Sequence, residues 1–299
     1  MSIDFAGFSA RLAATAAPPG AAELRLPSST PGESVAYELH LPEGAVKRVL
    51  VFVHGGGAHR RAGYDRMAQE LSRTAQVAVC LPDLRGHGAS DGRRGHIARP
   101  QLACEDLDLL LRAMRERFVD ARVYLGGHSS GAGLVLNFLT SKSLTRSPDG
   151  VVMLAPEFGF RAKLYRKASA PFGHVRIWPF LIDAFSGGAF GGGIEAVRFD
   201  YGGAPLFDGC LTAYTVGMAN AVTPSAPAGQ LASLAVPLVV ALAGKDELID
   251  PDRCRAFLAE HGANVLACDA LPETKHLDII LDAADFLRRA LVILEGGSK

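Results

Sequence analysis

Runs of apolar residues recur along the chain and predict the strands of one buried sheet. Several of them are apolar on both faces, which is typical of strands that are covered by helices on both sides. The runs span residues 49–53, 76–81, 123–125, 150–155, 236–243 and 264–268. Two earlier stretches, 23–26 and 36–41, predict strands that pair antiparallel at one edge of the sheet.

Amphipathic segments lie between these runs and predict helices. Residues 64–73 and 100–118 have apolar positions at helical spacing, as does the segment after residue 129, and a last helix is expected to end near residue 294. Strands that alternate with helices through short links are typical of a parallel sheet with helices on both faces. The predicted fold class is therefore α/β, with a mostly parallel, doubly wound sheet of about eight strands.

This alternation is interrupted over residues 157–229, where aromatic residues surround a glycine-rich centre. Such a segment does not extend the sheet, so we expect it to form an inserted cap, or lid, over the site. Residues 21–156 and 230–299 then make up the main domain. Residues 1–20 are rich in Ala, Gly and Pro and are expected to be a flexible lead-in.

Composition limits the class of protein further. The 299 residues suffice for one large domain with an insertion, and 31 basic residues balance 31 acidic ones, which gives nucleic acid no general attraction. No run reaches the about 18 apolar residues of a spanning helix. The start lacks the basic residues of a secretory signal, and five scattered cysteines lack metal-ligand spacing. We expect a cytoplasmic protein without a metal.

A glycine-flanked serine stands between a predicted strand and a predicted helix, in the sequence Gly127-His128-Ser129-Ser130-Gly131. The pattern Gly-x-Ser-x-Gly is typical of a sharp strand-to-helix turn that exposes the central serine. A glycine-rich turn with an incidental serine is the alternative. The flanking strand and helix favour Ser129 as a nucleophile, and His128 is expected to contact the substrate.

Three glycines follow the predicted strand at residues 49–53, between His54 and His59. Backbone N–H groups in such a loop can stabilise negative charge that develops during acyl transfer. A phosphate cradle is the alternative, but a Walker lysine and the Rossmann spacing are missing. We expect an oxyanion hole from the N–H groups of Gly56 and Ser130, with Gly57 as a further candidate. The two histidines are expected to shape the loop.

An acid and a histidine follow the last two predicted strands. Asp246 comes directly after residues 236–243, with Glu247 as the second candidate, while Asp250 precedes a proline as helix N-cap residues do. His276 lies in the loop before the last helix. A serine hydroxyl needs a base to remove its proton, so we expect His276 to be the base and Asp246 to orient it.

More than half of the aromatic residues fall in the predicted cap. About half of them could form the core of the cap, and the others are expected to line an apolar substrate pocket, among them Phe158, Trp178 and Phe190. Basic residues also cluster early in the cap: Arg161, Lys163, Arg166, Lys167 and Arg176. They indicate a solvated face or, alternatively, contact with an anionic head group at a membrane surface.

Taken together, these motifs resemble the α/β-hydrolase superfamily, and within it the monoacylglycerol lipases, lysophospholipases and related serine hydrolases. The matching segments are 53–59, 64–65, 83–92, 127–131, 244–250 and 275–276. The resemblance implies an α/β-hydrolase fold with an inserted cap, a covalent acyl-serine intermediate and no cofactor. Ser130 departs from the apolar residue, such as methionine, that members often carry after the nucleophile.

The leading interpretation is a serine hydrolase that cleaves small carboxylic esters with an apolar acyl group, such as a monoglyceride or a lysophospholipid. Acyl transfer or thioester cleavage in a biosynthetic pathway is the alternative, because the same three side chains would serve it. A receptor-like homologue that binds a ligand without turnover is disfavoured by the intact set of catalytic residue types. Ser129 excludes the carboxylate nucleophile of dehalogenases and epoxide hydrolases.

Overall fold

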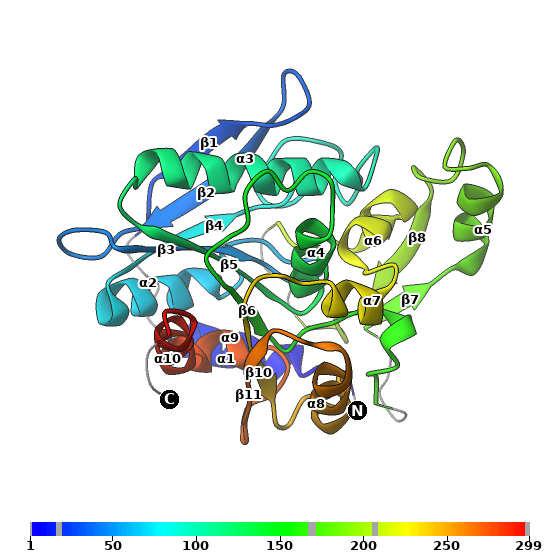
Figure 1. The fold of residues 1–299 in the computed structure, drawn as a ribbon. Coiled ribbons are helices and arrows are strands. Elements are labelled where there is room, and N and C mark those ends of the chain that lie inside the picture. Colours follow the sequence, from blue (N-terminus) through cyan, green and yellow to red (C-terminus); the bar gives the residue numbers. More distant parts are fainter. Residues whose placement is uncertain (1, 16–19, 167–171, 205–208, 297–299) are drawn as a thin grey trace.

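A computed structural model describes residues 2–15, 20–166, 172–204 and 209–296. An eight-stranded sheet forms its centre, in the order β1-β2-β4-β3-β5-β6-β10-β11 (Figure 1). The strands are β1 (Glu23–Pro27), β2 (Ser34–His40), β3 (Arg48–Val53), β4 (Val77–Pro82), β5 (Arg122–His128), β6 (Val151–Leu154), β10 (Leu238–Ala243) and β11 (Val265–Leu271). β2 pairs antiparallel with β1 and β4, and the pairs from β4 to β11 are parallel. The predicted fold class is confirmed.

The apolar runs of the central strands bury both of their faces. In β3, Val49, Val51 and Val53 belong to one hydrophobic core, whereas the intervening Leu50 and Phe52 belong to the other. Successive side chains of a strand point to opposite faces, so an unbroken apolar run serves two cores at once. This is why the sequence of β3 shows no polar alternation.

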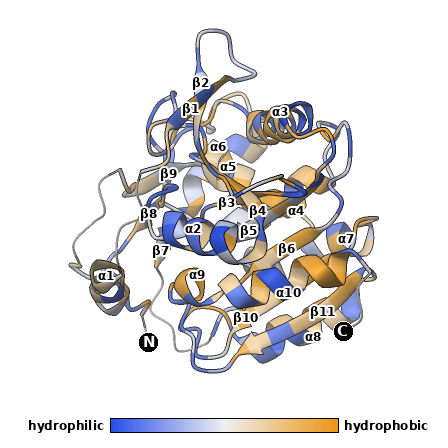
Figure 2. Cartoon of the chain, turned by 90° about the vertical axis from the view of Figure 1, so that its left-hand side faces the viewer, coloured by the Kyte–Doolittle hydropathy of each residue, from blue (hydrophilic) through white to orange (hydrophobic). Residues whose placement is uncertain are grey.

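Helices cover both faces of the sheet. On one face lie α3 (Gln101–Arg117), α4 (Ser130–Leu139) and α8 (Pro251–His261), and on the other lie α2 (Tyr64–Ala75), α9 (Ile279–Asp282) and α10 (Ala284–Leu294). Apolar colouring is concentrated in the strands and on the helix sides that face them (Figure 2). Because the central strands are parallel, the loops that follow them meet at one edge of the sheet, where α/β folds place their sites.

The prediction of a flexible lead-in over residues 1–20 needs a correction. Phe5–Ala14 forms a helix, α1. The Asp4 carboxylate caps it by accepting from the Gly7 N–H, and Phe8 and Leu12 are buried against the core beside α2 and α9. The spacing of these two residues is that of an amphipathic helix, but Ala and Pro in the surrounding sequence obscured it. Residues 16–19 lie outside the described ranges.

The segment between β6 and β10 does not join the central sheet. It carries a second, antiparallel sheet of three strands, β7 (Gly173–Val175), β8 (Glu195–Phe199) and β9 (Ala213–Thr215). Three helices and a short 3-10 turn accompany it: η1 (Phe160–Ala162), α5 (Ile177–Phe185), α6 (Val216–Val222) and α7 (Pro227–Ala232). Figure 1 shows α5 and β8 standing away from the central sheet. The expected cap, 157–229, lies in this segment, although α7 continues to Ala232, past the expected boundary. Its role as a lid over the site stays a prediction.

Among the described residues, no helix combines the length and the apolar character that crossing a bilayer needs.

Candidate active site

Ser129 occupies the sharp turn between β5 and α4. Its φ of +53° and ψ of −124° lie outside the regions that side chains favour, which costs about 1–3 kcal/mol. A Cβ atom at Gly127 would lie 2.6 Å from the backbone of Gly131, and one at Gly131 would lie 2.4 Å from the carbonyl oxygen of His54. Glycine at both positions therefore permits the turn that presents the serine side chain.

Three side chains from separate loops meet at this turn. The Oγ of Ser129 lies 2.9 Å from Nε2 of His276, and Nδ1 of His276 lies 2.7 Å from Oδ2 of Asp246. Ser129 is 9% exposed, and His276 and Asp246 are 2% and 3% exposed. The arrangement is a continuous path from a hydroxyl to a carboxylate through an imidazole, largely shielded from solvent.

The loop after β10 holds Asp246 in place. Its second oxygen, Oδ1, accepts hydrogen bonds from the N–H groups of Leu248 and Ile249, both at 2.8 Å. The neighbouring candidate Asp250 instead caps α8, where its Oδ1 accepts from the N–H of Asp252 at 3.1 Å. The structure thus gives the two acids the separate positions that the sequence indicates.

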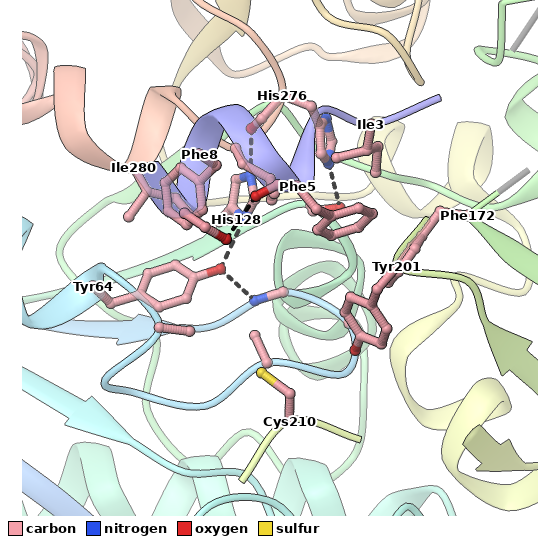
Figure 3. A pocket seen from close by; sticks show the side chains of 17 residues that line it. Ile3, Phe5, Phe8, Tyr64, His128, Phe172, Tyr201, Cys210, His276 and Ile280 are labelled. Carbon is pink, nitrogen blue, oxygen red and sulfur yellow. Dashed lines mark hydrogen bonds between the residues drawn. The ribbon is translucent and has the colours of Figure 1, made fainter. Parts of the chain in front are cut away.

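The backbone of His276 is fixed from two sides. Oε2 of Glu247 accepts from its N–H at 2.9 Å, and Nε2 of His128 donates to its carbonyl oxygen at 3.0 Å. Nδ1 of His128 then accepts from the Tyr64 hydroxyl at 2.9 Å, and the Tyr64 oxygen accepts from the Gly55 N–H at 2.8 Å (Figure 3). His128 and Tyr64 therefore connect the histidine loop with the glycine loop.

Burial and charge act differently on the two neighbouring histidines. Burial alone would lower the pKa of His276, but the negative charges of Asp246 and Glu247 and the bond to Asp246 raise it above its ordinary value. Burial, together with the nearby His276, lowers the pKa of His128 well below its ordinary value. His128 is therefore neutral near pH 7, while His276 can take up a proton that Asp246 stabilises.

Two backbone N–H groups lie beside the serine without an acceptor among the described residues: those of Gly56 and Ser130. The two residues are adjacent in space, since a Cβ built on Gly56 would lie 3.1 Å from Oγ of Ser130. The further candidate, Gly57, requires a correction. Its N–H donates to the Tyr214 hydroxyl at 2.8 Å, so it is not available to an oxyanion.

The two histidines of the glycine loop make local contacts. Nδ1 of His54 donates to the Gly55 carbonyl at 2.9 Å, and Nε2 accepts from the N–H of Leu84 at 3.1 Å. Burial lowers the pKa of His54, and it lowers that of His59 to about 4. Neither histidine contacts Ser129, in agreement with their expected role in shaping the loop.

A pocket opens at Ser129 and His276 (Figure 3). Of the four residues expected to bind substrate, His128 lines it and the other three do not. Phe158 is 1% exposed and packs against Phe257 in the core, whereas Trp178 on α5 and Phe190 are 51% and 77% exposed on the surface. The side chains that line the pocket are Ile3, Phe5, Phe8, Ser9, Ala58, Ala62, Tyr64, His128, Ser129, Phe172, Tyr201, Cys210, His276, Leu277 and Ile280.

The lining residues from α1 were not predicted from the sequence. Aromatic residues from the inserted segment do line the pocket, as expected, but they are not the ones that were named. Phe172 and Tyr201 line the pocket from that segment. Nothing in their local sequence distinguishes them from Trp178 or Phe190, because the path of the insert decides which aromatics reach the site. Of the expected basic cluster, Arg166 donates from Nε to the carbonyl oxygen of Asp246 at 2.6 Å, and Lys167 lies outside the described residues.

Within the described ranges, His, Cys, Asp and Glu side chains form no group of three or more that could hold a metal ion. Among the described cysteines, Cys80, Cys104, Cys254 and Cys268 are free thiols. With its own residues, the site can transfer a proton from a serine hydroxyl and stabilise an anion by two N–H groups.

Comparison with known proteins places this site in a wider context. The family model described as "Serine aminopeptidase, S33" matches residues 44–187. The monoglyceride lipase of Rattus norvegicus is 29% identical over 115 residues, which are 38% of this chain and 37% of that protein. The monoacylglycerol lipase of Mycolicibacterium smegmatis is 32% identical over 109 residues, 36% and 38% of the two chains. These matches span less than two fifths of each relative.

The likeness in three dimensions extends over nearly the whole chain. A monoglyceride lipase from Saccharomyces cerevisiae, solved with a substrate analogue, superposes with a TM-score of 0.70 at 13% identity, covering 94% of this chain and 98% of that one. At this identity the likeness establishes the fold. The resemblance to α/β-hydrolases of the monoacylglycerol lipase type, stated from the motifs, is confirmed.

Proposed function

We propose that this chain, an α/β-hydrolase similar to monoacylglycerol lipases, is a serine hydrolase that cleaves carboxylic esters with an apolar acyl group. The observation that carries the proposal is the path from Ser129 through His276 to Asp246, with 2.9 Å and 2.7 Å between the bonded atoms. The names of the similar lipases support an ester as the substrate. No cofactor enters the proposed reaction.

In the proposed reaction, Ser129 Oγ attacks the ester carbonyl carbon while Nε2 of His276 takes the hydroxyl proton. Asp246 stabilises the resulting imidazolium, whose raised pKa reflects that charge. The N–H groups of Gly56 and Ser130 hold the oxyanion. His276 returns the proton to the departing alcohol, and water activated by the same imidazole then hydrolyses the acyl-serine.

An ester is favoured over a peptide, although the matching family model is named for an aminopeptidase. Recognition of a free amino terminus needs a negative charge near the scissile bond, and the lining of the pocket contains no carboxylate in the described ranges. Its lining is predominantly apolar and aromatic, which suits an acyl group. Acyl transfer and thioester cleavage would use the same three side chains and are outcomes of the test.

The expected contact of the cap with a membrane surface stays a prediction. Apolar side chains on α5 support it, since Ile177 and Phe185 are 68% and 90% exposed. They lie apart from the pocket, so such contact would concern how the protein meets its substrate and not the reaction itself.

The proposal is tested with a panel of p-nitrophenyl esters, a monoglyceride, a thioester and an aminoacyl p-nitroanilide, each with and without an alcohol acceptor. We expect ester hydrolysis that Ser129→Ala removes. Exclusive turnover of the anilide, or product formation only with the acceptor, would assign the site to another reaction.

A further inference from the structure

Helix α1, which the sequence did not predict, forms part of the pocket wall. Ile3, Phe5, Phe8 and Ser9 line the same pocket as Ser129 and His276. Figure 3 shows α1 crossing the pocket, with the ring of Phe5 between His276 and the pair Phe172 and Tyr201. One wall of the pocket therefore comes from a segment outside the sheet and its loops.

Charged contacts attach this wall to the two loops that carry the acid and the histidine. The Asp4 carboxylate lies 2.6 Å from Nζ of Lys275, the residue before His276. The Asp4 N–H donates to Glu247 Oε1 at 3.1 Å, and Glu247 directly follows Asp246. Two turns later, Arg11 lies 2.7 Å from Asp282. These contacts hold α1 beside the loops that carry Asp246 and His276.

Aromatic contacts join α1 to the inserted segment across the pocket. The ring centroid of Phe5 lies 5.2 Å from that of Phe172 and 5.0 Å from that of Tyr201, and the last two rings are 5.4 Å apart. Such separations are typical of favourable aromatic pairs. The three rings form one closed group, so the side chain of Phe5 fills the space between the helix and the insert.

The space that remains at the serine is small. The cavity has a volume of about 60 Å³, whereas pockets for drug-sized ligands have about 300–1,000 Å³. A cavity needs about 10–15 Å³ on the same measure to hold one water, so the space beside Ser129 holds only a few groups of that size. An acyl chain of a few carbons fits there, and a chain as long as octanoyl would meet the ring of Phe5.

We propose that Phe5 is a specificity-determining residue that restricts the site to esters of short acyl groups. The inference rests on the proposed esterase function and adds the acyl length to it. Phe5 is half-buried and its backbone continues a helix that Phe8 and Leu12 anchor, so removal of its ring enlarges the pocket without removing the anchor of α1. In this proposal, α1 contributes no group that makes or breaks a bond. It limits the length of the acyl chain that the pocket accommodates.

The test compares kcat/KM for p-nitrophenyl acetate, butyrate and octanoate in the protein of 299 residues. We expect the wild type to prefer acetate or butyrate over octanoate. Phe5→Ala is expected to raise the octanoate-to-acetate ratio at least about tenfold, because each accommodated methylene can change discrimination by that order. Phe5→Trp is expected to lower the butyrate-to-acetate ratio. The control is Phe185→Ala, which removes the same ring from a position that is 90% exposed and outside the pocket lining.

The outcomes separate the two proposals. A wild type that prefers octanoate, or a Phe5→Ala variant with the wild-type ratio, overturns the role of Phe5 and leaves the esterase function in place. An equal change of ratio in Phe185→Ala also overturns it. A wild type that hydrolyses no ester of the series overturns both. Thermal unfolding of Phe5→Ala and Phe5→Trp near the wild-type Tm shows that altered ratios come from the pocket.

Discussion

The hydroxyl of Tyr214 accepts a hydrogen bond from the N–H of Gly57 at 2.8 Å, although the two residues are 157 positions apart in the chain. Tyr214 comes from β9 of the inserted segment, and its hydroxyl also lies 2.7 Å from Nε2 of His87. Gly57 has a φ of +71°, which glycine adopts without strain. The inserted segment therefore helps to orient the peptide next to Gly56.

From this contact we predict that Tyr214→Phe weakens the oxyanion hole. Loss of the hydroxyl leaves the Gly57 N–H without its buried acceptor, so the loop can turn and the Gly56 N–H loses its alignment. We expect kcat for p-nitrophenyl butyrate to fall by up to about 10²-fold, the lower bound for removal of a whole oxyanion donor. Steady-state kinetics measures it, and an unchanged kcat at an unchanged KM would dissociate Tyr214 from the hole.

The two aspartates of the loop after β10 are predicted to respond in opposite ways to the same substitution. Asp246→Asn removes the charge that stabilises protonated His276, and we expect kcat to fall by about 10⁴-fold with little loss of stability. Asp250→Asn changes a helix cap for another good cap residue and should preserve activity.

Asp250→Ala completes this comparison, because alanine cannot cap α8. It is expected to lower the free energy of unfolding by about 1 kcal/mol, measured by urea titration, and to leave kcat near the wild-type value. If Asp250→Asn instead abolished turnover while Asp246→Asn did not, the assignment of the acid would be reversed.

The raised pKa of His276 predicts the acidic limb of the pH profile. The imidazole must be neutral to accept the serine proton, and its pKa lies above the ordinary value of 6.5 because of Asp246 and Glu247. We therefore expect kcat/KM to increase with pH through a midpoint above 6.5. This midpoint reports the pKa of His276 in the free enzyme. Glu247→Gln removes a negative charge, favours the neutral imidazole and should move this midpoint to lower pH. A midpoint shifted upward by Glu247→Gln would have the wrong sign for this electrostatic account.

A buried group of charges below the glycine loop is predicted to matter for stability. Arg60 is 4% exposed and pairs with Asp83 and Glu38, which are 0% and 1% exposed, as well as with Glu23. Arg60→Met leaves the fully buried Asp83 without its ion-pair partner, while Glu38 keeps only its contact with Arg61 among the arginines, so we expect a loss of about 3–5 kcal/mol in the free energy of unfolding.

Urea titration checks this value, with Arg73→Met as the matched control. Arg73 pairs with Glu70 on the exposed side of α2, and loss of such a pair should change the stability by less than about 1 kcal/mol. Equal losses in the two variants would show that burial does not set the strength of the Arg60 contacts.

Much of the sheet was predictable because the sequence encodes it locally. The apolar runs at 49–53 and 76–81 form β3 and β4, and the glycines around Ser129 indicated the sharp turn between β5 and α4. The set Ser129, Asp246 and His276 was also predictable, since parallel strands bring the loops that follow them to one edge of the sheet whatever their distance in sequence. These inferences needed only the period of a strand and the direction of the sheet.

Other parts depend on contacts that no local pattern records. Phe5 and Tyr201 meet beside His276 only because α1 packs on the core and the insert returns over the sheet, so sequence reasoning placed Trp178 and Phe190 at the site instead. The availability of Gly56 and not Gly57 depends on one hydroxyl from the insert. Long-range packing thus determines the shape of the pocket, whereas local patterns determine the reactive groups.

The most direct test of the central claim is covalent labelling with a fluorophosphonate, followed by peptide mass spectrometry. The account predicts one phosphonyl group per chain on Ser129, much slower labelling in His276→Gln, and loss of ester hydrolysis in proportion to the labelled fraction. Full ester hydrolysis by a protein that is completely labelled on Ser129, or a label on another residue that accounts for the lost activity, would contradict it.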